Sequence, residues 1–380
     1  MSKYPKIHST FYILHSAFIL ALVAASCSSK LRDIALTTES MSLYEGDTYQ
    51  LGIDATPEDA DFTAVWTSSA PYVASVNATG LVVARSAGTC TVTVDADGHT
   101  ASCEVVVMEA ATMPGADVGV TDYGAVDGYF SVSNSRQVQF ACGNLQYQAS
   151  SGSWRFAETQ WSCRGADNRY ISSGTDRWID LFGWGTSGDS TGAVANQPWT
   201  SDSDDAHYIV GGDTANGIYG PNAIGDWGRV NHIQNHDERS GSWRVLTADE
   251  WRFLIGDNGL RANRWALATI NGIFRGLILI PDQWTAPDDA VFTAGKSRGY
   301  ATNSYSYQQW LAMQSTGVVF LPAAGVRDGL QVNNVNIDGY YWSATPDGDA
   351  ACTLGFCSDE VTPGFGRYRH LGLSVRLVID

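Results

Sequence analysis

The sequence predicts a mainly β protein, with a β-sandwich in its N-terminal part and an α+β domain in its C-terminal part. Short runs that alternate apolar and polar residues, separated by Gly, Pro and Asn, recur along the chain and are typical of strands. Two stretches, at Thr247 and at Ser306, carry the capping pattern of helices instead. The length of 380 residues is enough for two or three domains.

Residues 1–27 have the pattern of a lipoprotein signal peptide. Lysines precede an apolar run over residues 11–23, and small residues then lead directly to Cys27. This order predicts that Cys27 is lipidated, and ordinary cleavage just before the cysteine is the alternative. Ser28 at the next position is typical of lipoproteins sorted to the outer membrane, and the sequence leaves open which face of that membrane the protein occupies.

The chain is acidic, with a formal net charge of −17. Such a charge repels nucleic acid and anionic lipid surfaces, so neither is an expected partner. After the signal peptide, no apolar run reaches the about 20 residues that span a bilayer. The expected contact with the membrane is therefore the lipid anchor, and nothing in the pattern requires a cofactor.

Residues 31–108 form the first predicted domain, an all-β sandwich, because short alternating runs recur there with turn residues between them. The expected strands are residues 34–36, 48–51, 64–66, 73–76, 81–83 and 90–94. Four motifs stand out, Trp66-Thr-Ser-Ser69, Val73-Ala-Ser-Val76, Asn77-Ala-Thr-Gly-Leu81 and Ala87-Gly-Thr-Cys-Thr-Val-Thr-Val94. With them the segment resembles bacterial Ig-like domains of group 2, and the resemblance implies a spacer or adhesin module rather than an enzyme.

Cys90 and Cys103 flank a predicted hairpin whose turn is residues 95–98. A four-residue turn sets Val94 opposite His99, and the same register sets the two cysteines opposite each other, with Cα atoms about 4.5–5.5 Å apart. An exported protein folds in an oxidising setting, so the sequence predicts a Cys90–Cys103 disulfide, with two free thiols as the alternative. The pairing of the other cysteines stays open: Cys142, Cys163, Cys352 and Cys357.

Residues 109–122 are rich in Gly, Ala and Pro and are expected to be a linker, so that residues 123–380 form the second domain. Within that domain, Thr247 and Glu250 form a predicted capping box, with an apolar residue on either side in the arrangement of a hydrophobic staple. The same box recurs at Ser306. Two short helices among many strands indicate an α+β domain.

The end of the chain supplies three further strand patterns, residues 317–327, 339–345 and 372–378, each punctuated by Gly or Pro or flanked by Gly. Apolar residues at alternating positions in these patterns are expected to form the buried frame of the domain. They are Phe320, Leu321, Trp342, Val375 and Leu377.

A second resemblance rests on several segments that occur in order. They are Cys-Gly-Asn-Leu-Gln-Tyr-Gln (142–148), Trp-Arg-Phe-Ala-Glu (154–158), Ile-Asp-Leu-Phe-Gly-Trp-Gly-Thr-Ser-Gly (179–188), Trp-Arg-Val-Leu-Thr (243–247), Glu-Trp (250–251) and the three strand patterns at the end of the chain. Residues 124–378 thereby resemble the Fibrobacter-type major paralogous domain of Bacteroidetes lipoproteins. The resemblance implies a C-type-lectin-like fold, related to that of the formylglycine-generating enzymes, and no particular ligand.

In the resembling fold, loops between the final strands carry the ligand contacts. Here the residues between the strand patterns combine amides, carboxylates, Tyr and Arg, which can hydrogen-bond and stack. The candidate ligand-binding residues are Asn333, Asn336, Asp338, Tyr340, Asp347, Asp349, Asp359, Arg367, Tyr368 and Arg369. Their expected ligand is a glycan or a protein outside the cell, and an ordinary polar surface is the alternative.

Three patterns that resemble metal or catalytic sites are incomplete. His232 and His236 are four residues apart, as zinc ligands on a helix are, but neighbouring Asn and Gly residues favour a loop and no cluster completes the set. Aspartates within residues 202–205 lack the regular order of a calcium loop. Cys352 and Cys357 have the spacing of the thiol pair in formylglycine-generating enzymes, but the residues between them form one predicted strand, which points the thiols to opposite faces. No metal ligand and no catalytic residue is therefore predicted.

The sequence as a whole predicts a cell-envelope lipoprotein that presents a lectin-like domain, for adhesion or recognition, on an Ig-like stalk. Two other functions stay open. An enzyme of the formylglycine-generating type would need a reactive thiol pair. A structural subunit of a surface appendage would pair its end strands with neighbouring copies.

Overall fold

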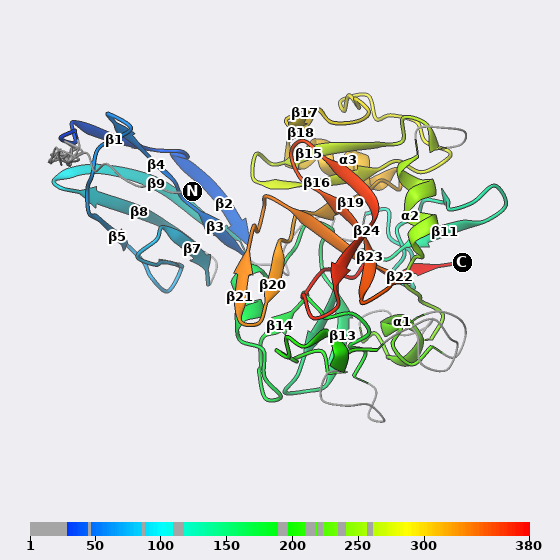
Figure 1. Cartoon of the computed structure of the whole chain (residues 1–380). Coiled ribbons are helices and arrows are strands. Elements are labelled where there is room, and N and C mark those ends of the chain that lie inside the picture. Colours follow the sequence, from blue (N-terminus) through cyan, green and yellow to red (C-terminus); the bar gives the residue numbers. More distant parts are fainter. Residues whose placement is uncertain are drawn as a thin grey trace, which may run out of the picture.

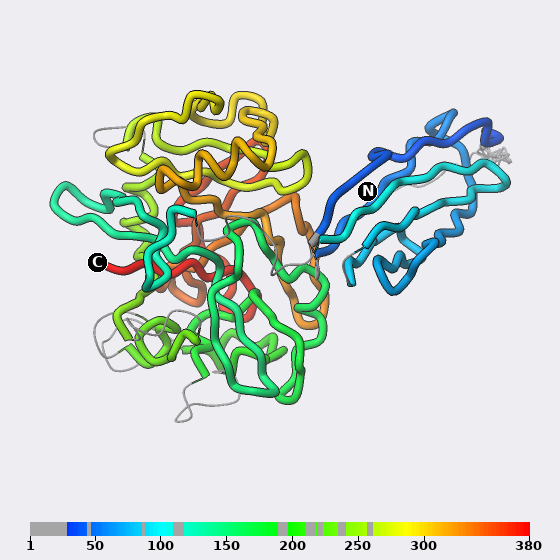
Figure 2. Tube along the Cα trace, turned by 180° about the vertical axis from the view of Figure 1, so that it is seen from behind, coloured from blue at the N-terminus to red at the C-terminus, as the bar shows by residue number. Residues whose placement is uncertain are grey.

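The computed structural model describes residues 29–44, 47–85, 88–108, 118–188, 197–209, 218, 223–234, 241–256 and 261–380. The N-terminal unit is the described part from Ser29 to Met108, and the C-terminal unit is the described part from Val118 to Asp380. The predicted signal peptide with Cys27, and most of the predicted linker, lie outside the described residues. The N-terminal unit projects from one side of the larger C-terminal unit in both views (Figures 1 and 2).

The N-terminal unit consists of short strands in sandwich-like sheets. They are β1 (Asp33–Leu36), β2 (Ser40–Tyr44), β3 (Thr48–Gln50), β4 (Ile53–Thr56), β5 (Ala64–Ser68), β6 (Ala74–Val76), β7 (Leu81–Ala84), β8 (Gly88–Ala96) and β9 (His99–Met108). One sheet has the order β2-β9-β8-β5, another has the order β3-β7-β6, and β1 pairs with β4. Leu43, Val82 and Val94 from these strands are fully buried in one apolar core. The six predicted strands are all confirmed.

The hairpin between β8 and β9 differs from its prediction. Its turn is the pair Asp97 and Gly98, both with positive φ (52° and 90°), which an Asp-Gly turn favours. The shorter turn moves the register by two residues, so Cys90 lies opposite Val105 instead of Cys103. The two thiols become diagonal neighbours, at a spacing of about 7–8 Å that exceeds the usual span of a disulfide. The predicted register is wrong, and the structure holds Cys90 and Cys103 as free thiols.

The C-terminal unit combines several small sheets with short helices. Its strands are β10 (Phe130–Ser131), β11 (Gln137–Phe140), β12 (Leu145–Gln148), β13 (Ser153–Phe156), β14 (Trp178–Ile179), β15 (Trp265–Ile270), β16 (Phe274–Leu279), β17 (Ser297–Tyr300), β18 (Asn303–Tyr305), β19 (Val319–Pro322), β20 (Val326–Asp328), β21 (Gln331–Asn333), β22 (Gly339–Asp347), β23 (Ala350–Phe356), β24 (Val361–Tyr368) and β25 (Val378–Ile379). Its helices are α1 (Trp227–Val230), α2 (Ala248–Ile255) and α3 (Tyr307–Ser315), with 3-10 helices at Gly165–Arg169 and Asp205–His207. The predicted mainly β class is confirmed. No helix in the described part of the chain combines the length and the apolar character needed to cross a bilayer.

The sheets of the C-terminal unit have the orders β18-β15-β16-β19, β22-β23-β24, β13-β12-β14 and β10-β11-β25, and β20 pairs with β21. The last predicted strand pattern is only partly a strand, because residues 372–374 make single bridges to three different segments and regular pairing begins at Val378. The predicted frame residues are all at most 1% exposed. Trp342 among them donates its indole N–H to the carbonyl of Phe182 at 2.6 Å.

Both predicted capping boxes are present. The Glu250 N–H donates to the Thr247 hydroxyl at 3.2 Å, and the Thr247 N–H donates to the Glu250 carboxylate at 2.8 Å. Ser306 and Gln309 make the same reciprocal bonds at the start of α3. Gly317, with a φ of 82°, follows the end of α3 as the helix-stop pattern predicts.

The two units contact each other at the turn between β15 and β16. Ile273 in this turn packs against the apolar core of the N-terminal unit. Conversely, Met108, the last residue of β9 in the N-terminal unit, packs against an apolar core cluster of the C-terminal unit. The side chain of Asn336 fixes the same turn, because it accepts from the Arg275 N–H at 2.8 Å and donates to the Ile273 carbonyl at 2.8 Å. We call this turn, residues 271–275, the junction turn.

Candidate functional site

The predicted ligand-binding residues lie around the sheet β22-β23-β24, which is coloured orange to red in Figure 1. One side of this sheet packs into the core through Tyr341 and Leu354. The other side carries a small open pocket of about 140 Å³. We call this surface the front face, and its pocket is lined by Tyr340, Thr353, Gly355, Phe356, Cys357, Glu360, Thr362, Phe365 and Arg367.

Arg367 stacks over two aromatic rings of the front face. Its guanidinium carbon is 4.3 Å from the ring centroid of Tyr340 and 5.3 Å from that of Phe365. The Tyr340 hydroxyl donates to the Asp338 carboxylate at 3.2 Å, and the Asn334 amide donates to the same carboxylate at 2.7 Å. Burial raises the pKa of Tyr340, so its hydroxyl keeps its proton. The result is a flat aromatic and guanidinium surface with polar groups at its rim.

The structure brings only part of the predicted set together. Asp338, Tyr340 and Arg367 meet on the front face. Asp359 lies in the turn after β23, where its carboxylate accepts from the Cys357 thiol at 3.0 Å. Asn333 is exposed on β21.

Three other predicted residues lie at the opposite end of the sheet. Asp347 pairs in register with Ala350, which pairs with Tyr368 on its other side. Asp349 stands in the turn between β22 and β23. Tyr368 is 62% exposed and stacks on the ring of His370, with 5.7 Å between the centroids. None of these three residues lines the front-face pocket.

Two predicted ligand-binding residues hold the fold together instead. The side chain of Asn336 makes two hydrogen bonds to the backbone of the junction turn. Arg369 is 3% exposed, donates to the Gly348 carbonyl at 2.6 Å, and has its guanidinium carbon 5.3 Å from the Trp184 ring. The strand β24 ends before Arg369, so the alternation that points Arg367 outward no longer applies to it.

The prediction missed Phe365, which is 54% exposed and completes the stack on Arg367. The sequence carries a signal for Phe365. Side chains two residues apart on a strand point to the same face, and Phe365 is two residues before Arg367. The bulge in β24 lies before Phe365, because Thr353 pairs with Phe365 while the next residue, Leu354, pairs with Pro363, so the alternation of Phe365 and Arg367 is intact. The bulge shifts only the residues before it, and Thr362 therefore lines the same pocket at an odd spacing from Phe365.

The described residues of the incomplete metal patterns have other partners or stand apart. Asp202 and Asp205 each bond to a histidine ring nitrogen, at 2.7 and 2.9 Å. His232 is exposed after α1, and His236 lies outside the described residues. Within the described ranges, no group of three or more His, Cys, Asp or Glu side chains is placed to hold a metal ion.

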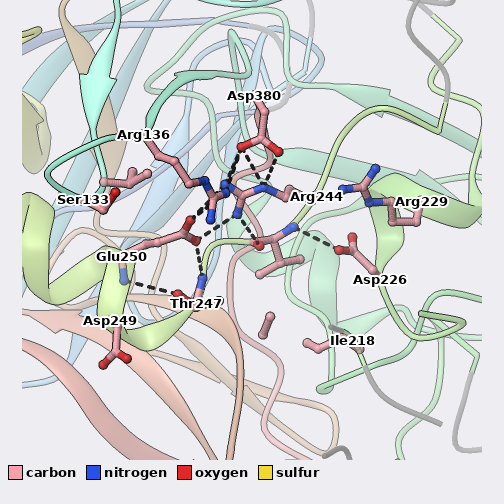
Figure 3. Close-up of a pocket in the computed structure, with 13 residues that line it drawn as sticks. Ser133, Arg136, Ile218, Asp226, Arg229, Arg244, Thr247, Asp249, Glu250 and Asp380 are labelled. Atoms are coloured by element: carbon pink, nitrogen blue, oxygen red, sulfur yellow. Dashed lines mark hydrogen bonds and ion pairs between the residues drawn. The ribbon is translucent and has the colours of Figure 1, made fainter. Parts of the chain in front are cut away.

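A larger pocket, of about 380 Å³, opens beside α2 (Figure 3). We call it the charged pocket. It is lined by Val132, Ser133, Arg136, Ile218, Asp226, Arg229, Arg244, Val245, Thr247, Asp249, Glu250, Ala344 and Asp380. These residues come from several separate segments, so no sequence motif could have gathered them.

Four charged side chains converge on one wall of the charged pocket (Figure 3). Arg244 donates to both carboxylate oxygens of Glu250, at 2.8 and 2.9 Å, and to Asp380 at 2.7 Å. Arg136 lies 3.2 Å from Glu250 and 3.1 Å from Asp380. Burial acts to lower the pKa of Arg244, and the hydrogen bonds to Asp380 and Glu250 outweigh it, so this pKa lies above its ordinary value. The network is fixed to the first turn of α2, because Glu250 also completes its capping box.

Asp226 lies on another wall of the charged pocket. Its side chain accepts from the Gly228 N–H at 3.0 Å and from the Val245 N–H at 3.2 Å. It is 3% exposed, and burial raises the pKa of its carboxyl to about 6 in spite of these bonds. The charge of this wall therefore changes at mildly acidic pH.

Comparison with known proteins bears on the N-terminal unit. Residues 31–105 match the family model of the bacterial Ig-like domain (group 2). This segment is a bacterial Ig-like domain. Over 77 residues the chain is 40% identical to a lacto-N-biosidase of Bifidobacterium bifidum, an alignment that covers 20% of this chain and 7% of that protein. The chain thus spans a small part of the length of this relative.

Two solved structures also match parts of the chain. Domains 5 and 6 of the S-layer protein SbsC match at 18% identity, over 20% of this chain and 44% of that one, with a TM-score of 0.19. A GH10 xylanase from termite gut that contains a bacterial Ig-like domain matches at 19% identity, over 24% of this chain and 23% of that one, with a TM-score of 0.16.

Proposed function

We propose that this chain is an outer-membrane lipoprotein whose C-terminal unit is a lectin-like binding domain, presented on the Ig-like domain to a glycan or protein ligand outside the cell. The observation that carries the proposal is the stack of Arg367 on Tyr340 and Phe365 beside an open pocket. The opposite side of the same sheet is buried, so the stack sits on a rigid support. Tyr and Arg in such a setting are the residue types that dominate binding energies at interfaces.

Binding is favoured over catalysis of the formylglycine-generating type by the state of the two thiols. Cys352 is buried in β23, and Cys357 follows the end of that strand. Burial raises the pKa of both thiols, whereas a reactive thiol needs a lowered pKa. The two thiols are not joined to each other or to another described cysteine by a disulfide.

Replacing Tyr340, Phe365 and Arg367 together by Ala is expected to weaken ligand binding at least about thirtyfold, because a hot spot supplies about 2 kcal/mol or more. The full chain, purified in detergent, is first applied to an array of glycans and extracellular proteins to find the ligand. The affinity of the variant for that ligand is then measured against the unchanged protein.

The chain offers a matched control for this experiment. Arg177 lies over the ring of Tyr170, 4.4 Å from its centroid, in the same kind of stack on another surface. Tyr170→Ala with Arg177→Ala should leave binding unchanged. Equal losses in the two variants, or no loss in the front-face variant, would place the site elsewhere.

The anchor is tested separately. If Cys27 carries lipid, Cys27→Ala should move the protein from the detergent phase into the soluble fraction of a phase separation, because the acyl chains supply its attachment to the membrane. An unchanged distribution would mean that the signal peptide is of the ordinary kind.

A further inference from the structure

We propose that the charged pocket is a second binding site and that its ligand is a neutral sugar. The pocket is distinct from the front face, since no residue lines both. Its volume of about 380 Å³ lies within the range of sites for small molecules.

The charges of the pocket select a neutral ligand. Arg136 and Arg244 present N–H donors directly beside the carboxylate of Glu250, and Asp226 presents a further carboxylate on another wall. Arg229 and Asp249 also line the pocket, so side chains of both signs surround the space. An anion meets the carboxylates and a cation meets the guanidinium groups, so neither sign of charge is favoured throughout the pocket. A hydroxyl group both donates and accepts, so neighbouring hydroxyls on a sugar ring can bond to both kinds of group without adding charge.

The binding groups are in place before a ligand arrives. The side chains of Arg244 and Glu250 are 10% and 8% exposed and hold each other by two hydrogen bonds. Asp226 is oriented by hydrogen bonds from two backbone N–H groups, those of Gly228 and Val245. Groups that need no ordering on binding cost little entropy. Arg136 and Asp380 are 54% and 53% exposed, which leaves an entrance.

The test uses the full chain, purified in detergent, and a library of neutral mono- and disaccharides, with binding measured by titration calorimetry. At least one sugar should bind, and Arg136→Ala and Asp226→Asn should each weaken it at least about tenfold, as expected for the loss of a hydrogen bond to a charged group. The Arg136 side chain is half-exposed, so Arg136→Ala is expected to fold normally. This variant therefore tests the proposal even where Asp226→Asn disturbs the fold. Arg177→Ala is the matched control, because Arg177 is 46% exposed and also pairs with an aspartate, Asp167, at 2.6 Å.

Several outcomes would overturn this proposal. They are no binding by any neutral sugar, unchanged affinity in the Arg136→Ala variant, and tighter binding of inorganic phosphate or lysine than of any sugar. The front-face variant of Tyr340, Phe365 and Arg367 should bind the sugar normally. Loss in that variant, with full binding in the pocket variants, would assign the sugar to the front face, leaving the proposed function standing and this inference refuted.

Discussion

An Arg376→Met protein is expected to lose about 3–5 kcal/mol of unfolding free energy, because each buried acceptor left without a donor costs about 1–3 kcal/mol, and this loss is enough to unfold a marginal domain. Arg376 is 1% exposed, and it donates to the side chain of Asn144 and to the carbonyls of Ala141, Gln160 and Phe320, at 2.9 to 3.2 Å. Burial lowers the pKa of Arg376 to about 10, so it stays charged at neutral pH. Methionine fills similar space and donates nothing, so three buried carbonyls lose their donor.

Urea unfolding followed by tryptophan fluorescence reports mainly on the C-terminal unit, where Arg376 lies. Trp66 is the only tryptophan of the Ig-like domain, and the other twelve are in the C-terminal unit. Arg298→Met is the control, since Arg298 is exposed on β17. Arg376→Lys should also be strongly destabilised, because a single ammonium cannot reach acceptors in four directions. Equal unfolding midpoints for Arg376→Met and Arg298→Met would contradict the argument.

An Asp226→Asn protein is expected to be more destabilised at pH 4 than at pH 7. Burial raises the pKa of Asp226 from 3.8 to about 6 in the folded chain, so the folded state holds this proton more tightly than the unfolded state does. The group therefore adds stability below about pH 4, and that contribution is lost as the pH rises through 6. Asparagine does not titrate, so the difference in unfolding free energy between the two proteins should shrink by up to about 3 kcal/mol between pH 4 and pH 7.

Urea unfolding of both proteins at one-unit steps from pH 4 to pH 7 gives this difference directly. Asp249→Asn is the control, because the Asp249 side chain is 91% exposed at the start of α2. This variant removes one carboxyl group at an exposed position and so shows the effect of the substitution without the burial that Asp226 has. A difference for Asp226→Asn that is flat, or that grows with pH, would show that burial does not raise this pKa.

Features that depend on a few neighbouring residues were predictable from the sequence. The capping box at Thr247 is complete within four residues, and the strands of the Ig-like domain follow from alternation within short runs. The predicted hairpin register is wrong for a local reason. Residues 95–98 fit a four-residue turn, but the Asp97–Gly98 pair within them favours a two-residue turn, which the structure has.

The sites were harder to predict because they depend on distant segments. The front face combines Tyr340 of β22 with Phe365 and Arg367 of β24, and these strands meet only through the register that each makes with β23. The charged pocket joins Arg136, Arg244 and Asp380, which lie far apart in the sequence. Each of these residues alone has the pattern of an ordinary surface charge.

The junction turn has a mechanical consequence. Ile273 in this turn packs against the core of the Ig-like domain. Asn336 donates to the carbonyl of Ile273 and lies in the loop that also carries Asp338, which accepts from the hydroxyl of Tyr340 on the front face. A tilt of the Ig-like domain would therefore be transmitted to this loop, and under the proposed function a ligand that holds the front face would stiffen the contact between the two units. Thermodynamic reciprocity makes the two effects equal in free energy. Under the proposed function, force on the Ig-like domain would thus change the affinity of the front face for its ligand.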